Sequence, residues 1–153
     1  MTMFEWIKSK LRVAEPAARA AAGESGEATR SRMLGQTEAF HDEGAVEQAR
    51  QHCLALLRLF PNDARALCLM AEIAADARQT EEGLQWAQRA AAADPRAASP
   101  HYLAGRMLQA EGRLTQAESS YHAALTLAPD HARTHTNLGC VLHMQGKLDV
   151  ALA

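Results

Sequence analysis

Aromatic residues are scarce in this chain, and neither sign of charge dominates it. Aromatics make up 5% of the 153 residues, and the formal net charge is −2 at pH 7. A nucleic-acid binder usually carries a strongly basic surface, so this near-neutral balance argues against that class of protein. Hydrophobic residues still make up 48% of the chain. Many of them are alanines, which suit closely packed helices better than a large globular interior.

Cysteine is also sparse, and long apolar runs are missing. Cys53, Cys68 and Cys140 are widely spaced and form no CxxC pair, so neither a disulfide framework nor a zinc site is expected. The sequence has no apolar run of the roughly 18–20 residues that a membrane-spanning helix needs. Its N-terminus lacks the apolar core and small-residue cleavage site of a secretory signal. We therefore expect reduced, buried thiols in a cytoplasmic protein.

The N-terminus favours a short amphipathic helix over residues 1–14. Phe4 and Ile7 fall on one side of this helix, and Lys8 falls on the other. A docking or fraying helix is the favoured interpretation. Contact with a membrane surface is the alternative, because Trp6 and a net positive charge suit a helix that lies in the interface.

Proline provides the main organising signal. Pro61, Pro95 and Pro129 each stand 34 residues from the next, and each closes a stretch rich in Ala and Leu. A fixed period between 20 and 50 residues marks a stacked repeat array, and 34 is the period of a two-helix repeat. Counting back from each proline gives repeats over residues 30–63, 64–97 and 98–131 and a partial repeat over 132–153. Residues 15–29, rich in Ala, Gly and Glu, predict a flexible linker before the array.

The third repeat shows its two helices most clearly. Ser99 and Pro100 predict a helix start, because the hydroxyl can cap free N–H groups and proline is tolerated in the first turn. Gly112 supplies the left-handed residue that ends this helix. A second helix is expected to open near Leu114, and Pro129 stops it. The pattern is that of a helix–turn–helix hairpin.

These units resemble tetratricopeptide repeats over nearly all of residues 30–153. The small residue that the family places midway along the first helix appears as Ala71, Gly105 and Gly139, with the larger Thr37 in the first unit. The turn glycine appears as Gly44, Gly112 and Gly146, and Arg78 replaces it in the second unit. The two packing places on the second helix hold Ala49, Gly83, Ala117 and Ala151, and then Leu56, Ala90 and Ala124. The resemblance implies an all-α, right-handed superhelical solenoid of antiparallel helix pairs with about three and a half repeats. The chain resembles the bacterial arrays that precede glycosyltransferase or sulfotransferase domains.

The fourth repeat stops about one turn into its second helix. A helix cut there cannot bury its apolar residues, so we expect residues 147–153 to fray. We also expect the natural polypeptide to continue beyond Ala153. The uncovered repeat end is a candidate surface for self-association.

No pattern in the sequence indicates catalysis, a cofactor or a metal. There is no Gly-rich phosphate loop and no nucleophile elbow. His131 and His135 are four residues apart, and His143 is three residues from Cys140, so each pair could share a helix face. No carboxylate follows at a metal-site spacing such as HExxH. Structural packing is therefore expected, and His101 and His135 occupy places where the family commonly has a bulky packing residue.

The remaining candidate site is a groove. The resemblance implies that the first helices of successive repeats line a concave face whose side chains meet ligands. By register, this face holds Glu38 and His41 in the first repeat. In the later repeats it holds Arg65, Cys68, Leu69, Glu72, Asp76, Tyr102, Leu103, Arg106, Gln109, Arg133, Thr136, Asn137, Cys140 and His143. Mixed charges and a tyrosine suit an extended peptide.

The expected function is therefore a protein-interaction module, not an enzyme, that binds a peptide or helical segment. The chaperone-type carboxylate clamp of the family is not matched, because Cys68, Glu72 and Leu103 stand at comparable places. Asn137 resembles the groove asparagines of O-linked N-acetylglucosamine transferases, although leucines replace it in the preceding units. A competing hypothesis is that the chain is the substrate-recruiting N-terminal arm of a longer glycosyltransferase or sulfotransferase.

Overall fold

The computed structural model of the chain describes residues 25–146, which form seven helices and no strand. The all-α class predicted from the sequence is confirmed. The expected helix over residues 1–14, most of the expected linker and the tail at 147–153 lie outside the described residues. The chain divides after Pro61 into two compact units. Within residues 25–146, no helix combines the length and hydropathy that crossing a membrane requires.

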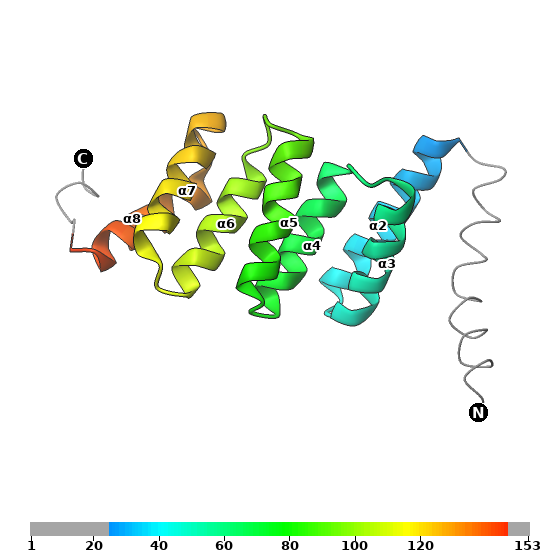
Figure 1. Cartoon of the computed structure of the whole chain (residues 1–153), viewed down its shortest axis with the longest axis horizontal. Coiled ribbons are helices and arrows are strands. Elements are labelled where there is room, and N and C mark those ends of the chain that lie inside the picture. The colour runs from blue at the N-terminus through cyan, green and yellow to red at the C-terminus, as the bar shows by residue number, and fades with distance from the viewer. Residues whose placement is uncertain (1–24, 147–153) are drawn as a thin grey trace, which may run out of the picture. The chain divides into compact units, whose positions relative to one another are not determined.

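The first unit contains a hairpin of α2 (Gly26–Asp42) and α3 (Val46–Leu59) (Figure 1). Helix α2 begins before residue 30, so the predicted linker over 15–29 is wrong at its C-terminal end. Ser25 explains the difference, because its hydroxyl oxygen accepts a hydrogen bond from the Ala28 N–H at 3.3 Å. This bond satisfies one of the free donors at the helix start.

A buried threonine joins the two helices of the first unit. Thr37, which stands at a place usually held by a small residue, has 0% exposure. Its hydroxyl donates to the Met33 carbonyl at 2.8 Å and lies 3.1 Å from Nδ1 of His52 on α3. The larger residue is tolerated because its polar atom finds partners inside the hairpin. Leu56 on α3 is fully buried at the packing place that the repeat register assigns to it.

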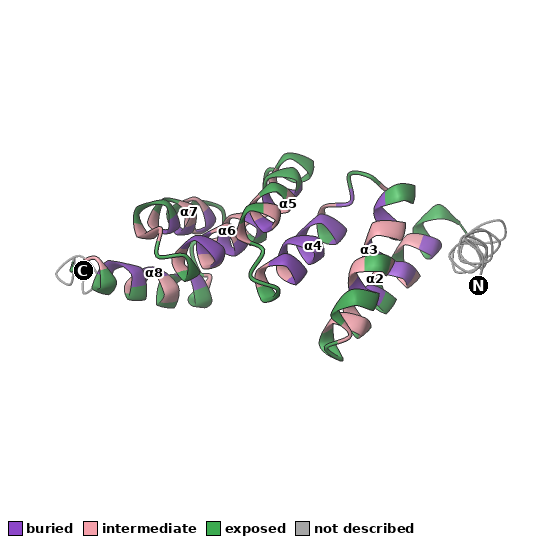
Figure 2. Cartoon of the chain, turned by 60° about the horizontal axis from the view of Figure 1, so that its bottom comes forward, coloured by how far each residue is buried: buried purple, intermediate pink, exposed green. Residues whose placement is uncertain are grey.

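The second unit stacks five helices in two layers (Figure 2). One layer contains α4 (Ala64–Asp76), α6 (Ser99–Ala110) and α8 (Ala132–Met144). The other contains α5 (Thr80–Ala93) and α7 (Leu114–Leu127). Each helix packs on the next one in the chain, and α6 also packs on α4 and α8. This is the stacking of helix pairs that the 34-residue period predicts.

The two layers approach closely at the small-residue places. A β-carbon added to Gly105 on α6 would lie 2.5 Å from Cε1 of Tyr121 on α7, which is too close for any side chain. Gly83 on α5 is similarly covered, by the Met107 side chain of α6. Gly139 on α8 differs, because nothing in the described part of the chain lies within 4 Å of such an atom. Glycine is therefore required for packing at position 105, whereas at position 83 the flexible end of Met107 can move aside. At position 139 the described residues set no such requirement.

The turn inside each helix pair contains one residue with a left-handed backbone. Gly44, Gly112 and Gly146 have φ of +74°, +72° and +75°, and Arg78 takes this place between α4 and α5 with φ +56°. The predicted substitution of arginine for the turn glycine is thus confirmed in the backbone. A β-carbon makes this conformation costly, by roughly 1 kcal/mol, so arginine is an unusual choice here.

The helix starts differ between repeats. Asp63 caps α4, since its Oδ1 accepts a hydrogen bond from the Ala66 N–H at 2.8 Å. The prediction that Ser99 caps α6 is wrong: Ala98 is the N-cap residue, and no side chain makes a capping bond there. Pro100 in the first turn explains why none is needed, because it removes one donor and presets the helical φ.

Candidate functional site

The predicted groove residues of the later repeats all lie on α4, α6 and α8, in one layer of the second unit. The structure separates them by exposure. The exposed ones are Arg65, Asp76, Arg133, Thr136, Cys140 and His143, and the half-buried ones are Glu72, Arg106, Gln109 and Asn137. These ten residues are called the candidate face below. The buried ones are Cys68, Leu69, Tyr102 and Leu103.

Three of the buried residues are corrections to the sequence prediction. Cys68, Leu69 and Leu103 are 4%, 1% and 3% exposed, so they are packing residues and not ligand contacts. Full burial of a leucine side chain stabilises the fold by about 1.5–3 kcal/mol, which a surface position would forgo. Burial, aided by the carboxylate of Glu72, also raises the pKa of the Cys68 thiol to about 11. That thiol stays protonated and out of reach of a ligand.

A polar network holds two amides of the candidate face in place. The Tyr121 hydroxyl of α7 donates to Oε1 of Gln109 on α6 at 2.7 Å. The side chain of Asn137 on α8 is hydrogen-bonded to the same hydroxyl. Burial raises the pKa of Tyr121 to about 12, although the bond from Asn137 acts in the opposite direction. The hydroxyl therefore stays neutral, and it links α6 and α8 through a residue of the opposite layer.

Tyr102 forms an aromatic cluster beside this network. Its ring centroid lies 6.2 Å from that of Tyr121 and 5.1 Å from that of His131, with the histidine edge-on. The Arg133 guanidinium lies over the Tyr102 ring at 5.8 Å from the centroid. Such a contact contributes on the order of 0.5–1 kcal/mol at an exposed site. Tyr102 is only 9% exposed, so it supports Arg133 more than it meets a ligand itself.

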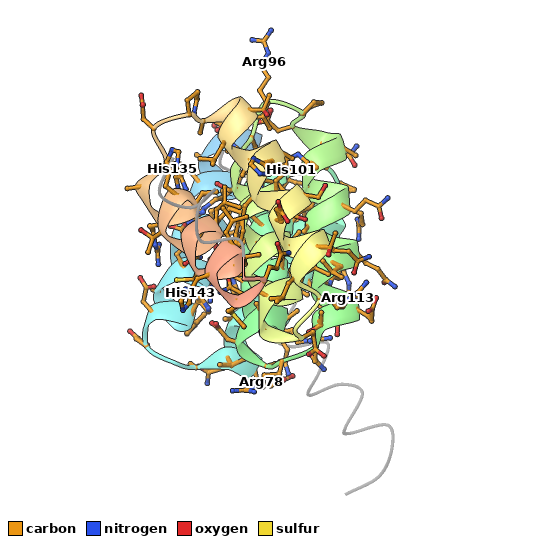
Figure 3. The ribbon with its side chains drawn as sticks, turned by 90° about the vertical axis from the view of Figure 1, so that its left-hand side faces the viewer. Arg78, Arg96, His101, Arg113, His135 and His143 are labelled. Atoms are coloured by element: carbon orange, nitrogen blue, oxygen red, sulfur yellow. The ribbon has the colours of Figure 1, made fainter. Side chains whose placement is uncertain are left out.

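Two histidines near the start of α8 have local partners. His131 Nδ1 lies 2.5 Å from the Thr134 hydroxyl, and His135 donates from Nε2 to the Pro129 carbonyl at 2.6 Å. His135 is exposed, so its expected packing role is wrong (Figure 3). The free carbonyl just after α7 explains its position, because it offers the imidazole an acceptor at the surface. Within residues 25–146, no group of three or more potential ligand side chains could hold a metal ion.

Charge is unevenly distributed over the candidate face. Helix α4 contributes two carboxylates, Glu72 and Asp76, and one guanidinium, that of Arg65, which lies 4.0 Å from Glu72. Helices α6 and α8 contribute Arg106, Arg133 and the imidazole of His143, and no carboxylate. The face is therefore acidic toward α4 and basic toward α8. The sequence reasoning named these residues without finding this polarity, which could have been read by sorting them by helix.

Comparisons with known proteins show which proteins this architecture resembles. The sequence model of the tetratricopeptide repeat matches residues 96–153, and no curated protein matches the chain. A mutant O-GlcNAc transferase from Thermobaculum terrenum superposes with a TM-score of 0.73 and 29% identity, over 78% of this chain and 23% of the transferase. The type III secretion translocator chaperone SycD of Yersinia enterocolitica has a TM-score of 0.74 and 19% identity, over 79% of this chain and 96% of the chaperone. MamA has a TM-score of 0.76 and 17% identity, over 99% of this chain and 90% of MamA.

The fold and these matches define a repeat scaffold built from helix pairs. More specifically, residues 96–153 match the tetratricopeptide repeat, and the chain resembles the transferase, SycD and MamA in fold. It spans about a quarter of the length of the transferase that it resembles. Residues 25–146 contain repeat helices and show no catalytic domain.

Proposed function

We propose that the second unit binds a peptide or helical segment of a partner protein on the candidate face, without covalent chemistry. The observation that carries this proposal is the network through Tyr121, which holds Gln109 and Asn137 at fixed positions on neighbouring helices. The fold supports the coarser role, since tetratricopeptide repeats act as scaffolds for protein interactions.

Preorganisation is the physical reason for choosing this face. Immobilising a flexible side chain on binding costs about 0.5–1.5 kcal/mol, and a side chain that is already held avoids much of that cost. Gln109 and Asn137 are held by Tyr121, and Arg133 is held over Tyr102. Amides both donate and accept hydrogen bonds, so a pair of fixed amides suits the backbone of an extended or helical peptide.

The charge polarity of the face also restricts the ligand. A segment with basic residues toward α4 and acidic residues toward α8 would complement the carboxylates of α4 and the guanidiniums of Arg106 and Arg133. Complementary charges raise the association rate and disfavour the reversed orientation. The face therefore selects the direction in which a peptide lies.

A displayed peptide library selected on the full chain tests this function. The affinity of a selected peptide is then compared between wild type, the double variant Arg106→Glu, Asn137→Ala and the control Gln88→Ala, Arg96→Glu. The control residues are exposed and lie outside the candidate face, and Figure 3 shows Arg96 projecting from the upper edge. We expect Kd to rise about 10-fold or more for the first variant only, since charge-assisted bonds contribute on that order. Equal affinities for all three proteins would exclude the candidate face.

A second function is favoured by one comparison. The 29% identity to an O-GlcNAc transferase extends over 78% of this chain, and the transferase is much longer. We therefore also propose that the repeats recruit substrate for a glycosyltransferase or sulfotransferase domain of a longer parent protein. Reading the coding sequence downstream of Ala153 tests this: a transferase domain in frame supports it, and a stop codon at that point excludes it.

A cytoplasmic location and self-association through α8 remain proposals. The C-terminal end of α8 exposes Met144 to 57%, and an apolar side chain in that position can contact a second copy. Sedimentation equilibrium at high protein concentration tests the association. A monomer throughout the concentration range excludes it.

A further inference from the structure

A small hollow of about 80 Å³, partly open to solvent, lies between the α4–α5 turn and the C-terminal end of α6. Arg78 and Thr80 line it from the turn, and Arg106, Met107 and Glu111 line it from α6 and its C-cap. Arg106 also belongs to the candidate face. The hollow is therefore where that face reaches the turn edge of the second unit.

No contact within the described fold accounts for an arginine at position 78. Its backbone has φ +56°, a conformation that the three other turns give to glycine. Its side chain makes no hydrogen bond or ion pair with the part of the chain that the structure describes. A strained arginine with no internal partner points to a role outside the fold.

The charges around the hollow leave room for an anion. Arg106 likewise makes no hydrogen bond or ion pair with residues 25–146, and its one electrostatic partner is the neutral Tyr121 hydroxyl. Glu111 is the single carboxylate among the lining residues, and it accepts a hydrogen bond from the Thr80 hydroxyl at 3.0 Å. Two guanidiniums therefore face one carboxylate that already has a donor.

The neighbouring carboxylates do not neutralise these guanidiniums. Glu81, at the start of α5, pairs with Arg113 at 2.7 Å. Glu72 on α4 is the carboxylate nearest in register to Arg106, and it lies 4.0 Å from Arg65. The lining of the hollow keeps a net charge of +1, from two arginines and one glutamate.

We propose that this hollow binds an anionic side chain of the partner segment, a carboxylate or a phosphate, between Arg78 and Arg106. Guanidinium groups bind both anions through paired hydrogen bonds, and the Met107 side chain shields one wall from water. The inference rests on the proposed function for the identity of the ligand. The anion site itself is testable without any peptide.

The first experiment uses small anions as probes. Inorganic phosphate and acetate are titrated separately into the full chain at constant ionic strength, and backbone and arginine side-chain N–H signals are followed by NMR. We expect saturable shifts at Arg78, Thr80 and Arg106 in wild type and in the matched control Arg96→Gln. Shifts with phosphate alone assign the site to a phosphorylated side chain, and shifts with both anions assign it to a carboxylate as well. Shifts that never saturate overturn the proposal.

Two variants separate the effect of losing a guanidinium group from the effect of losing the folded structure. Arg78→Gly installs the residue that the other turns use, so it should fold with a higher urea midpoint while losing about 10-fold or more in anion affinity. Arg106→Gln should lose affinity to a similar extent. Unchanged anion affinity in Arg78→Gly would overturn the proposal. A third outcome is that wild type binds the anion, but a selected peptide binds Arg78→Gly and wild type equally tightly. In that case the peptide does not occupy the hollow, and the proposal that the hollow binds an anionic side chain of the partner is refuted. The proposed peptide binding on the candidate face is not affected by this result.

Discussion

The close approach of α6 and α7 makes a sharp prediction about Gly105. Replacing it with alanine places a β-carbon 2.5 Å from Cε1, 2.6 Å from Cδ1 and 2.9 Å from Cζ of Tyr121. The tyrosine ring has 0% exposure, so it cannot swing into solvent to make room. Either the ring or the helix axis must move.

The expected cost combines two destabilising contributions and one stabilising contribution. Overpacking a core position costs about 1–3 kcal/mol. Displacing the ring also weakens the 2.7 Å hydrogen bond from Tyr121 to Gln109, which contributes about 0.5–1.5 kcal/mol. Alanine returns about 0.5–1 kcal/mol because it is the better helix former. The free energy of unfolding should fall by about 2 kcal/mol, which shifts a urea midpoint down by about 1 M.

Gly139→Ala is the matched control. It changes the same residue at the same place of the next repeat, in the interior of α8, where nothing described lies within 4 Å of the new atom. Helix propensity alone should then raise the free energy of unfolding by about 0.5–1 kcal/mol. Urea unfolding followed by circular dichroism should show midpoints that move in opposite directions for the two variants.

A double-mutant cycle identifies the cause. In a Tyr121→Ala background, Gly105→Ala meets no ring and should be close to neutral or stabilising. If Gly105→Ala raises the midpoint of the otherwise unchanged protein, as Gly139→Ala does, then the steric reasoning about α6 and α7 is refuted.

Three further predictions concern single side chains. Burial and a nearby guanidinium lower the pKa of His52. The imidazole is therefore protonated more readily in the unfolded chain than in the folded one, and the stability of the fold should decrease as the pH drops below about 6.5. In His52→Gln, the difference between the urea midpoints at pH 7.5 and pH 5.5 should become smaller than in wild type. Cys140 is exposed, whereas Cys53 and Cys68 are buried. Iodoacetamide at pH 8 should therefore modify one thiol of the folded protein rapidly. Rapid alkylation of all three thiols would contradict the burial of Cys53 and Cys68. Asp63→Ala removes the 2.8 Å capping bond to the backbone N–H three residues later and should cost about 1 kcal/mol or more. Asp63→Asn should retain most of that stability, as thermal denaturation can check.

The sequence predicted which helices carry the candidate face, but it did not predict how deeply each side chain is buried. Counting from the prolines correctly assigned Arg106, Asn137 and Arg133 to the helices that carry the candidate face. The same counting placed Leu103 on that face, although its side chain is 3% exposed. A register states which way a side chain points from its own helix, and it says nothing of how near the neighbouring helix lies. The sequence could not predict the hollow beside Arg78 for the same reason, because its walls come from a turn and a helix end that lie almost 30 residues apart in the chain.

The sequence by itself determined the elements of this protein. A 34-residue period, prolines after the second helices and glycines in the turns specify helix pairs through local rules of backbone conformation, which need no knowledge of distant contacts. Only the tertiary structure decided which of these positions are essential. Gly105 and Gly139 are equivalent in the repeat, yet one faces the Tyr121 ring and the other faces nothing described. The difference arises because packing depends on the residue that arrives from another helix, and the pattern of a single helix does not contain it.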